Sequence, residues 1–339
     1  MAQFFATVLP GLEHVLKDEI REKIADGAFL SIERGKVYFA SDLPPEALKA
    51  LRTADNLYRL IHRFEVGPHK IHLADIEREI YRCEPIRGEL NFGAIGFKVN
   101  ASRAGNHAYS RFDAAEAAAR GIARRDSRWR QVSGGLHEME FRLDVHHREA
   151  VFGMKLTDAK FRYRGEERKF TSAALRPTVA HALVRISNPE PADVFVDPCC
   201  GSGTILAERL EYPYGRIEGG DVSLEAVAAS KENIGALERV SVRRWDARQL
   251  PIASGRIDKI VTNLPFGRQI AANEDIPSLY GDLLREMRRV LKKNGTIFCL
   301  TSADEALMQA AERAHFRLGI EATLHLKGLR PTLFSLRKP

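Results

Sequence analysis

The C-terminal half of this chain alternates short apolar runs with amphipathic runs, and this alternation constrains the fold more than any other feature of the sequence. Apolar runs typical of buried strands lie at residues 193–197, 216–221, 240–245, 257–263 and 295–300. Runs typical of helices follow at 205–210, 224–235, 278–291 and 304–314. This alternation predicts a doubly wound α/β domain with a parallel sheet. The last runs, 320–326 and 332–336, turn at Lys327-Gly328 and predict an antiparallel hairpin at one edge, so that the sheet has seven strands.

The first 156 residues show a different pattern, which is typical of two α+β units. Residues 1–66 have the order strand, helix, two strands, helix and strand that suggests a ferredoxin-like domain, and Gly67-Pro68 marks its end. Residues 67–156 contain helix-like runs at 71–81 and 113–124 and strand-like runs at 94–101, 138–146 and 149–156. The last two strands are expected to pair through a turn at His147-Arg148. A polar linker at 157–170 then leads to the sheet domain at 171–339.

The composition excludes several classes of protein. With 339 residues, 44% of them hydrophobic, the chain can give each unit a core, which excludes a disordered chain or a disulfide scaffold. Its four cysteines have the spacing of neither a zinc site nor a secreted module, so we expect no metal and a reducing, cytoplasmic location. No uncharged apolar run reaches the ~18 residues that a membrane helix needs. We therefore expect no membrane segment, and the sequence indicates no obligate protein partner.

The charge favours a polyanionic partner. The formal net charge is +7. A cluster of cations surrounds Trp129, as phosphate contacts combined with base stacking require, and it consists of Arg120, Arg124, Arg125, Arg128 and Arg130. A solvated helix end explains the same cluster equally well.

The loop after the first strand of the sheet domain can bind a ligand. It runs from Asp197 through two cysteines to Gly201, Ser202, Gly203 and Thr204. The glycines allow a tight turn and a close approach of the backbone to a ligand, and the helix that begins near Thr204 offers free amides. A dinucleotide fingerprint requires a small residue where Leu206 stands, so nicotinamide binding is disfavoured.

Three carboxylates end successive strands. Asp197 ends the first strand, Asp221 the second and Asp246 the third. A carboxylate about 20 residues beyond the glycine loop can accept both ribose hydroxyls, Asp246 can accept from an adenine amino group, and Asp197 can hold an ammonium. Each could instead cap the following helix, but three in succession argue against that explanation for the set.

These features resemble the class I S-adenosylmethionine-dependent methyltransferases over residues 171–339. The resemblance implies that Asp221 binds the ribose of the cofactor and Asp246 its adenine. It places Asp197, Gly201, Ser202 and Gly203 around the methionine part, and the further residues expected to bind the cofactor are Cys200, Thr204 and Asn263. Cys199 and Cys200 are interpreted as small loop residues rather than metal ligands.

The fourth strand ends in Asn263-Leu264-Pro265-Phe266-Gly267. This loop resembles the Asn-Pro-Pro-Phe/Tyr motif of enzymes that methylate exocyclic amino groups of nucleobases, with Leu in place of the first Pro. The Asn263 side-chain oxygen and the Leu264 carbonyl can accept the two N–H groups of the target nitrogen and make it more nucleophilic. Pro265 would fix the turn, and Phe266 would stack on the extruded base, which contributes ~1 to 3 kcal/mol.

The Leu variant of this loop resembles the THUMP-containing tRNA guanine-N2 methyltransferases, the TrmN family. Residues 97–122 support this, because Lys98-Val99-Asn100, Arg103, His107 and the segment 109–111 resemble a THUMP domain. The resemblance implies methylation of guanosine N2 in tRNA, with recognition of the 3′ end and a target in the acceptor stem, at position 6. RNA contacts are then expected from Arg103, Arg120, Arg124, Arg125 and Arg128. A ribosomal RNA substrate or a catalytically silent RNA-binding adaptor remains the alternative.

Overall fold

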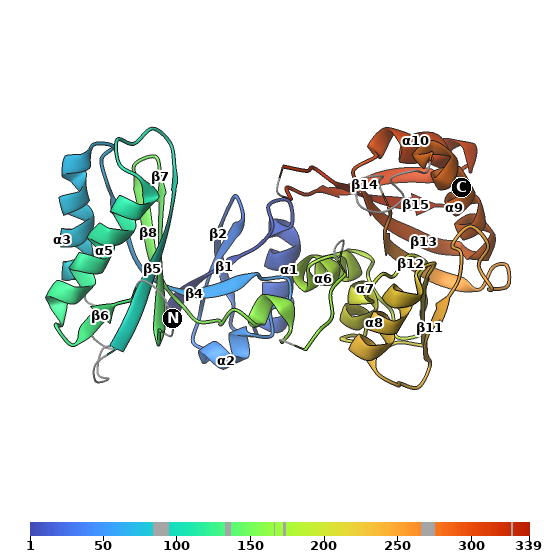
Figure 1. Ribbon diagram of the computed structural model, residues 1–339, viewed down its shortest axis with the longest axis horizontal. Helices are drawn as coiled ribbons and strands as arrows, with labels where there is room; N and C mark the ends of the chain where they lie inside the picture. The colour runs from blue at the N-terminus through green and yellow to red at the C-terminus, as the bar shows by residue number, and fades with distance from the viewer. Residues whose placement is uncertain (84–94, 133–136, 166, 172–173, 266–274, 327) are drawn as a thin grey trace.

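The computed structural model describes the whole chain except residues 84–94, 133–136, 166, 172–173, 266–274 and 327. Figure 1 shows an elongated molecule, in which the second unit lies at one end, the sheet domain at the other and the first unit between them. Two sheets, of eight and seven strands, organise the described residues. Among those residues, no helix is long and apolar enough to span a bilayer.

The first unit has the predicted ferredoxin-like fold. Its elements are β1 (Ala2–Thr7), α1 (Glu13–Lys23), β2 (Ala28–Glu33), β3 (Lys36–Ser41), α2 (Pro45–Leu48) and β4 (Asn56–Glu65). The strands are antiparallel in the order β2-β3-β1-β4. Along β1, Phe4 and Ala6 belong to the core shared with the helices, whereas Phe5 stacks on Tyr58 on the opposite face. This alternation is the period of two expected of a strand.

The second unit continues the same sheet. Its elements are the short 3-10 helix η1 (Lys70–His72), α3 (Leu73–Arg82), β5 (Ile95–Ala104), α5 (Arg111–Arg125), β6 (Trp129–Gln131), β7 (Met139–His146) and β8 (Glu149–Lys155). The predicted hairpin of β7 and β8 is present, and β8 pairs with β4 of the first unit. The two units, whose predicted boundary is at Gly67, therefore share one continuous sheet through the pairing of β4 with β8. Helices α3 and α5 cover its outer face (Figure 1). They can approach closely because Gly121 of α5 has no Cβ, which would lie only 2.7 Å from the Glu77 carbonyl oxygen of α3.

The third unit is the predicted seven-stranded sheet. After the 3-10 helix η2 (Phe161–Tyr163), its elements are α6 (Pro177–Ile186), β9 (Val194–Asp197), α7 (Thr204–Arg209), β10 (Arg216–Asp221), α8 (Leu224–Ile234), β11 (Val240–Arg244), β12 (Ile257–Asn263), α9 (Ile276–Val290), β13 (Leu291–Thr301), α10 (Asp304–Arg313), β14 (Arg317–Thr323) and β15 (Thr332–Arg337). The order is β11-β10-β9-β12-β13-β15-β14, with β15 antiparallel to both neighbours. The α/β class, the strand number and the antiparallel terminal hairpin are confirmed.

One apolar core joins the first and third units. Leu16 and Ile20 of α1 belong to the same buried cluster as Val179 and Leu183 of α6. Each side chain that is fully removed from water stabilises the fold by roughly 1.5 to 3 kcal/mol, and the two units share this core. The sheet domain is thereby held against the first unit, and the order of its strands positions the candidate site.

Candidate active site

The site lies where the strand order reverses. Strand β9 is central and pairs with β10 on one side and β12 on the other, all in parallel. Ligands in such sheets bind in the crevice outside the carboxyl ends of these strands. Asp197 ends β9, Asp221 ends β10 and Asn263 ends β12, so three residues predicted from the sequence meet at this crevice.

The glycine loop is held to the end of β10. The Gly201 amide donates to Asp221 Oδ2 at 3.0 Å, and the Cys200 amide donates to the Gly220 carbonyl at 2.9 Å. Gly201 and Gly203 have φ values of 51° and 78°, in the left-handed region that favours glycine. The Gly203 amide donates to the Cys200 carbonyl at 2.8 Å, which closes the turn before α7. The loop is therefore preformed around the Asp221 carboxylate.

Asp197 is a buried acid beside this loop. Its residue is 1% exposed, and Oδ1 accepts the Cys199 amide at 3.2 Å. Burial raises the pKa of Asp197 to about 7, and the nearby Asp221 carboxylate acts in the same direction. Among the described residues, no lysine or arginine forms an ion pair with it. A cationic ligand can supply the opposite charge beside Asp197, and the sulfonium and ammonium groups of S-adenosylmethionine are of this kind.

Asp221 and Asp246 differ in their surroundings. Asp221 accepts the Gly201 amide on one oxygen and the Ser223 amide on the other, both at 3.0 Å, and keeps lone pairs for ribose hydroxyls. Asp246 follows β11, and both its oxygens accept hydrogen bonds from the Arg248 guanidinium. The hydrogen bond from Arg248 lowers the pKa of Asp246. If Asp246 binds adenine, its carboxylate has to accept hydrogen bonds from both the adenine amino group and Arg248.

Two further residues at the site, Val222 and Asn233, were not among those predicted from the sequence. Val222 is 63% exposed immediately after Asp221, where an apolar side chain can cover one face of a bound adenine. Asn233 of α8 accepts the Lys169 amide at 2.9 Å and donates to the carbonyls of Lys169 and Ser202, both at 2.8 Å. The end of the linker is thereby attached to the glycine loop. An apolar residue after a strand-end acid is a signal for Val222, whereas nothing local to Asn233 predicts its contacts.

The Asn263 loop is anchored to the next strand of the sheet. Asn263 is half-buried and pairs in register with Leu300 of β13. The Leu264 amide donates to the Leu300 carbonyl at 3.0 Å, and the Leu264 side chain is buried. The Tyr280 hydroxyl donates to the Pro265 carbonyl at 2.9 Å. Phe266, predicted to stack on the base, lies outside the described residues.

The arginines predicted to bind RNA contact the protein itself. Arg120 and Arg124 both donate to Glu77 of α3, at 3.0 and 2.7 Å, and the hydrogen bonds from both arginines lower the pKa of Glu77. Arg125 donates to the carbonyls of Tyr81 and Cys83, and Arg128 forms an ion pair with Asp126 at 2.6 Å. These side chains can still face solvent, but carboxylates neutralise part of the charge of Arg120, Arg124 and Arg128.

The expectation that Trp129 stacks on a base is wrong. Trp129 is 2% exposed and packs between Phe97 and Phe141 in the core of the second unit. It belongs to β6, whose pairing with β5 turns the indole inward. A tryptophan in a basic segment is therefore a core residue here.

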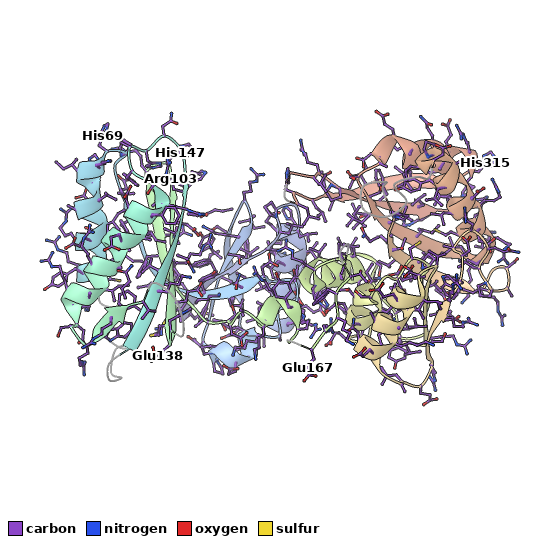
Figure 2. The ribbon with its side chains drawn as sticks, viewed as in Figure 1. His69, Arg103, Glu138, His147, Glu167 and His315 are labelled. Atoms are coloured by element: carbon purple, nitrogen blue, oxygen red, sulfur yellow. The ribbon has the colours of Figure 1, made fainter. Side chains whose placement is uncertain are left out.

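Arg103 lies in a different setting, at the end of β5. Its side chain is exposed and donates to the Gly105 carbonyl at 3.2 Å, and no ion pair with a carboxylate is found among the described residues. Figure 2 shows Arg103, His69 and His147 at the same end of the second unit, opposite Glu138. A cleft of about 330 Å³ beside them is lined by Pro68, Gly105, Asn106, His147 and Arg148. The described residues contain no cluster of metal ligands.

Comparisons with known proteins agree with this architecture. Residues 164–332 match the RMKL-like methyltransferase domain family, and residues 3–56 match the RlmL ferredoxin-like domain family. The tRNA (guanine(6)-N2)-methyltransferase of Thermus thermophilus is 29% identical, over 98% of both chains. The tRNA (guanine(6)-N(2))-methyltransferase THUMP3 of Bos taurus is also 29% identical, over 95% of this chain and 83% of that protein. The crystal structure of TrmN from Thermus thermophilus superposes with a TM-score of 0.84 and 26% identity, over 100% of both chains.

Proposed function

The chain belongs to the TrmN family of class I S-adenosylmethionine-dependent methyltransferases, and from this premise we propose that it methylates N2 of guanosine 6 in the acceptor stem of tRNA. The observation that carries the proposal is the position of Asn263 and Leu264 at the end of β12, beside the glycine loop at the end of β9. This arrangement combines a cofactor loop with two oxygen acceptors for an amino group.

The site residues divide the binding of the cofactor among them. Asp197 provides a buried negative charge for the cationic part, and Asp221 provides acceptors for the ribose. Val222 covers the adenine, and Asp246 accepts its amino group. When bound, S-adenosylmethionine supplies an electrophilic methyl group on sulfur.

The Asn263 loop acts on the target nitrogen. The lone pair of an exocyclic amino group is delocalised into the base, which makes the nitrogen a weak nucleophile. The Asn263 side-chain oxygen and the Leu264 carbonyl accept its two N–H groups and favour the tetrahedral geometry of the transition state. These interactions strengthen as the N–H groups become more acidic, so they act mainly on the rate. The proton leaves to water after the transfer.

The elongated shape supports a substrate that spans the molecule. The second unit and the sheet domain lie at opposite ends of the long axis (Figure 1). We expect the second unit, residues 67–156, to act as the THUMP domain and to bind the 3′ end, with Arg103 contacting phosphate. An acceptor stem can then extend toward the crevice, whereas a free nucleoside cannot contact both regions. A tRNA substrate and four free cysteines also support a cytoplasmic location.

The proposal is tested with labelled S-adenosylmethionine and unmodified tRNA transcripts. After methylation, the RNA is digested to nucleosides and the products are separated. N2-methylguanosine is expected with the unaltered transcript and is expected to disappear when guanosine 6 is replaced by adenosine. Methylation that persists in the altered transcript contradicts the assignment of position 6. Methylation of ribosomal RNA but not tRNA would favour the alternative substrate, and cofactor binding without transfer to any RNA would favour the adaptor.

A further inference from the structure

A buried tyrosine contacts the Asn263 loop, the segment after β12 that contains Asn263, Leu264 and Pro265. Tyr280 of α9 is 0% exposed, and its hydroxyl lies 2.9 Å from the Pro265 carbonyl oxygen and 2.7 Å from Thr301 Oγ1. Thr301 ends β13 and is also 0% exposed. Burial raises the pKa of Tyr280, so its hydroxyl stays protonated at every working pH.

The direction of each hydrogen bond in this group follows from the donors available. The Ala303 amide donates to Thr301 Oγ1 at 2.9 Å, and the Pro265 carbonyl can only accept. The Tyr280 hydroxyl therefore gives its proton to Pro265 and accepts the proton of Thr301. The chain of donors runs in one direction from Ala303 to the Asn263 loop, and both hydroxyls of this group, those of Tyr280 and Thr301, have partners.

The Leu264 carbonyl is held between two fixed points. On one side, the Leu264 amide is bound to the Leu300 carbonyl. On the other side, the Pro265 carbonyl is bound to Tyr280, and the proline ring fixes φ of Pro265 near −65°. Only small rotations of the peptide between Leu264 and Pro265 are then compatible with both anchors. Tyr280 thus restrains the orientation of a carbonyl that it does not contact.

We propose that Tyr280, oriented by Thr301, is a positioning residue for methyl transfer, which aims the Leu264 carbonyl at the second N–H of the target amino group. The inference rests on the proposed function, because it requires an amino nitrogen as the acceptor of the methyl group. Asn263 binds one N–H through its side chain, whereas the second acceptor is backbone and can be aimed only through its neighbours. Both hydroxyls act without touching substrate or cofactor.

The test compares the Tyr280→Phe variant with Tyr38→Phe. Tyr38 is a matched control, since it is buried in the first unit, far from both proposed binding regions, and its hydroxyl donates to the Glu33 carboxylate at 3.0 Å. Single-turnover methylation is measured with saturating tRNA and cofactor, and cofactor affinity is measured by calorimetry. We expect Tyr280→Phe to lower the rate by about 10- to 100-fold while the affinities for cofactor and tRNA change less than about twofold. Tyr38→Phe is expected to keep the rate within about twofold, whatever stability it loses.

A double-mutant cycle with Thr301→Val separates positioning from a structural role. If Thr301 acts through Tyr280, Thr301→Val lowers the rate in the wild-type background and has little further effect in Tyr280→Phe. A rate within twofold of wild type in Tyr280→Phe would overturn the inference, and so would additive effects of the two substitutions or a parallel loss of cofactor affinity. The proposed function is judged separately, by the nucleoside that the wild-type enzyme makes. If the wild type methylates a different RNA, the cycle is run on that RNA, and a wild type that methylates none overturns both proposals.

Discussion

Arg52 of the ferredoxin-like domain forms a two-point ion pair with Glu208 of the methyltransferase domain. The Nε and Nη2 atoms of Arg52 lie 3.0 and 3.1 Å from the two carboxylate oxygens, and Glu208 is 0% exposed. Burial opposes ionisation of Glu208, but the hydrogen bond from His181 and the charges of Arg164 and Arg52 lower its pKa to about 2. Because Glu208 belongs to α7, which follows the glycine loop, the pair connects the first domain to the cofactor side of the sheet.

Removing the arginine is expected to destabilise the protein. In Arg52→Met, a buried carboxylate loses its two-point partner, and we expect the free energy of unfolding to fall by about 3 kcal/mol, as measured by urea denaturation. Arg185→Met is the control, because Arg185 also bridges the two domains but pairs with Glu22, which is 58% exposed. That exposed pair should contribute less than about 1 kcal/mol. Equal losses in both variants would show that burial of Glu208 is not what makes the Arg52 pair strong.

The Asp221 carboxylate is expected to control cofactor affinity. Asp221→Ala removes the proposed ribose acceptor and the contact with the Gly201 amide, so the affinity for S-adenosylmethionine should fall about 10- to 100-fold in calorimetry. The affinity for tRNA should not change. Ser223→Ala is the control for a helix-cap role, since Ser223 Oγ accepts the Ala226 amide at 3.2 Å. It should lower stability by about 1 kcal/mol and spare the cofactor. Unchanged cofactor affinity in Asp221→Ala would contradict the assignment.

Cofactor binding is expected to depend on pH through Asp197. Its pKa is about 7 in the free protein, and a bound cation favours the ionised form. The affinity for S-adenosylmethionine should therefore rise from pH 6 to pH 8 and level off above, with proton release on binding below pH 7. Calorimetry in two buffers of different ionisation enthalpy measures the released proton. Asp197→Asn should bind more weakly and without this pH dependence, whereas a flat profile for the wild type would argue against contact with the cation.

The same group acts in the opposite sense on the stability of the free protein. The folded-state pKa of Asp197 is above the ordinary value of about 3.9. Its contribution to folding is therefore fully present below about pH 4 and is lost as the pH rises through about 7. Wild type and Asp197→Asn should differ in the pH dependence of thermal unfolding within this window.

Much of the methyltransferase domain could be predicted because its signals are local. Short strand-like runs alternate with helix-like runs, and Asp197, Asp221 and Asn263 end their strands, so topology alone brings them together. The family resemblance drawn from the glycine loop and the Asn263 loop is confirmed by the comparisons. The boundaries assigned to the domains and the roles assigned to single site residues stay predictions.

The remaining features depend on contacts between distant segments. The pairing of β4 with β8 joins residues about 90 positions apart, and no local pattern specifies which edge a strand adds to. Arg120 and Arg124 of α5 form hydrogen bonds with Glu77 of the adjacent helix α3, more than 40 positions away in the sequence. Trp129 is buried by Phe97 and Phe141, which reach it through the sheet. Charge clusters in a sequence do not show which of their members the fold neutralises.

The contribution of cations to tRNA binding is expected to follow their pairing. Arg103→Ala should weaken tRNA binding about 3- to 10-fold and lower the salt slope by about one unit, since a phosphate contact is lost. Arg124→Ala should change affinity by less than about twofold, because Glu77 already neutralises part of that charge. Filter binding over a series of salt concentrations measures both. If Arg124→Ala weakens tRNA binding more than Arg103→Ala does, the arginines of α5 would be the main RNA contacts.

The Asn263 side chain is expected to act on the chemical step. In Asn263→Ala, single-turnover methylation should fall by about 100-fold or more, because an acceptor that strengthens in the transition state is lost. The affinities for tRNA and S-adenosylmethionine should change little. The fold should also persist, since the backbone pairing of β12 with β13 does not need this side chain.

The Asp and Gly variants decide between catalysis and turn formation at this position. A residue that merely forms the turn after β12 can be Asp or Gly, so both variants would then keep near wild-type rates. If the Asn263 amide is catalytic, the Asn263→Gly variant is slow because it has no side-chain acceptor. The Asn263→Asp variant places a full negative charge where Asn has a neutral oxygen, next to a crevice that already contains Asp197 and Asp221. We therefore expect both variants to be slow under saturating conditions, and a near wild-type rate in either one would show that the Asn263 side chain takes no part in methyl transfer.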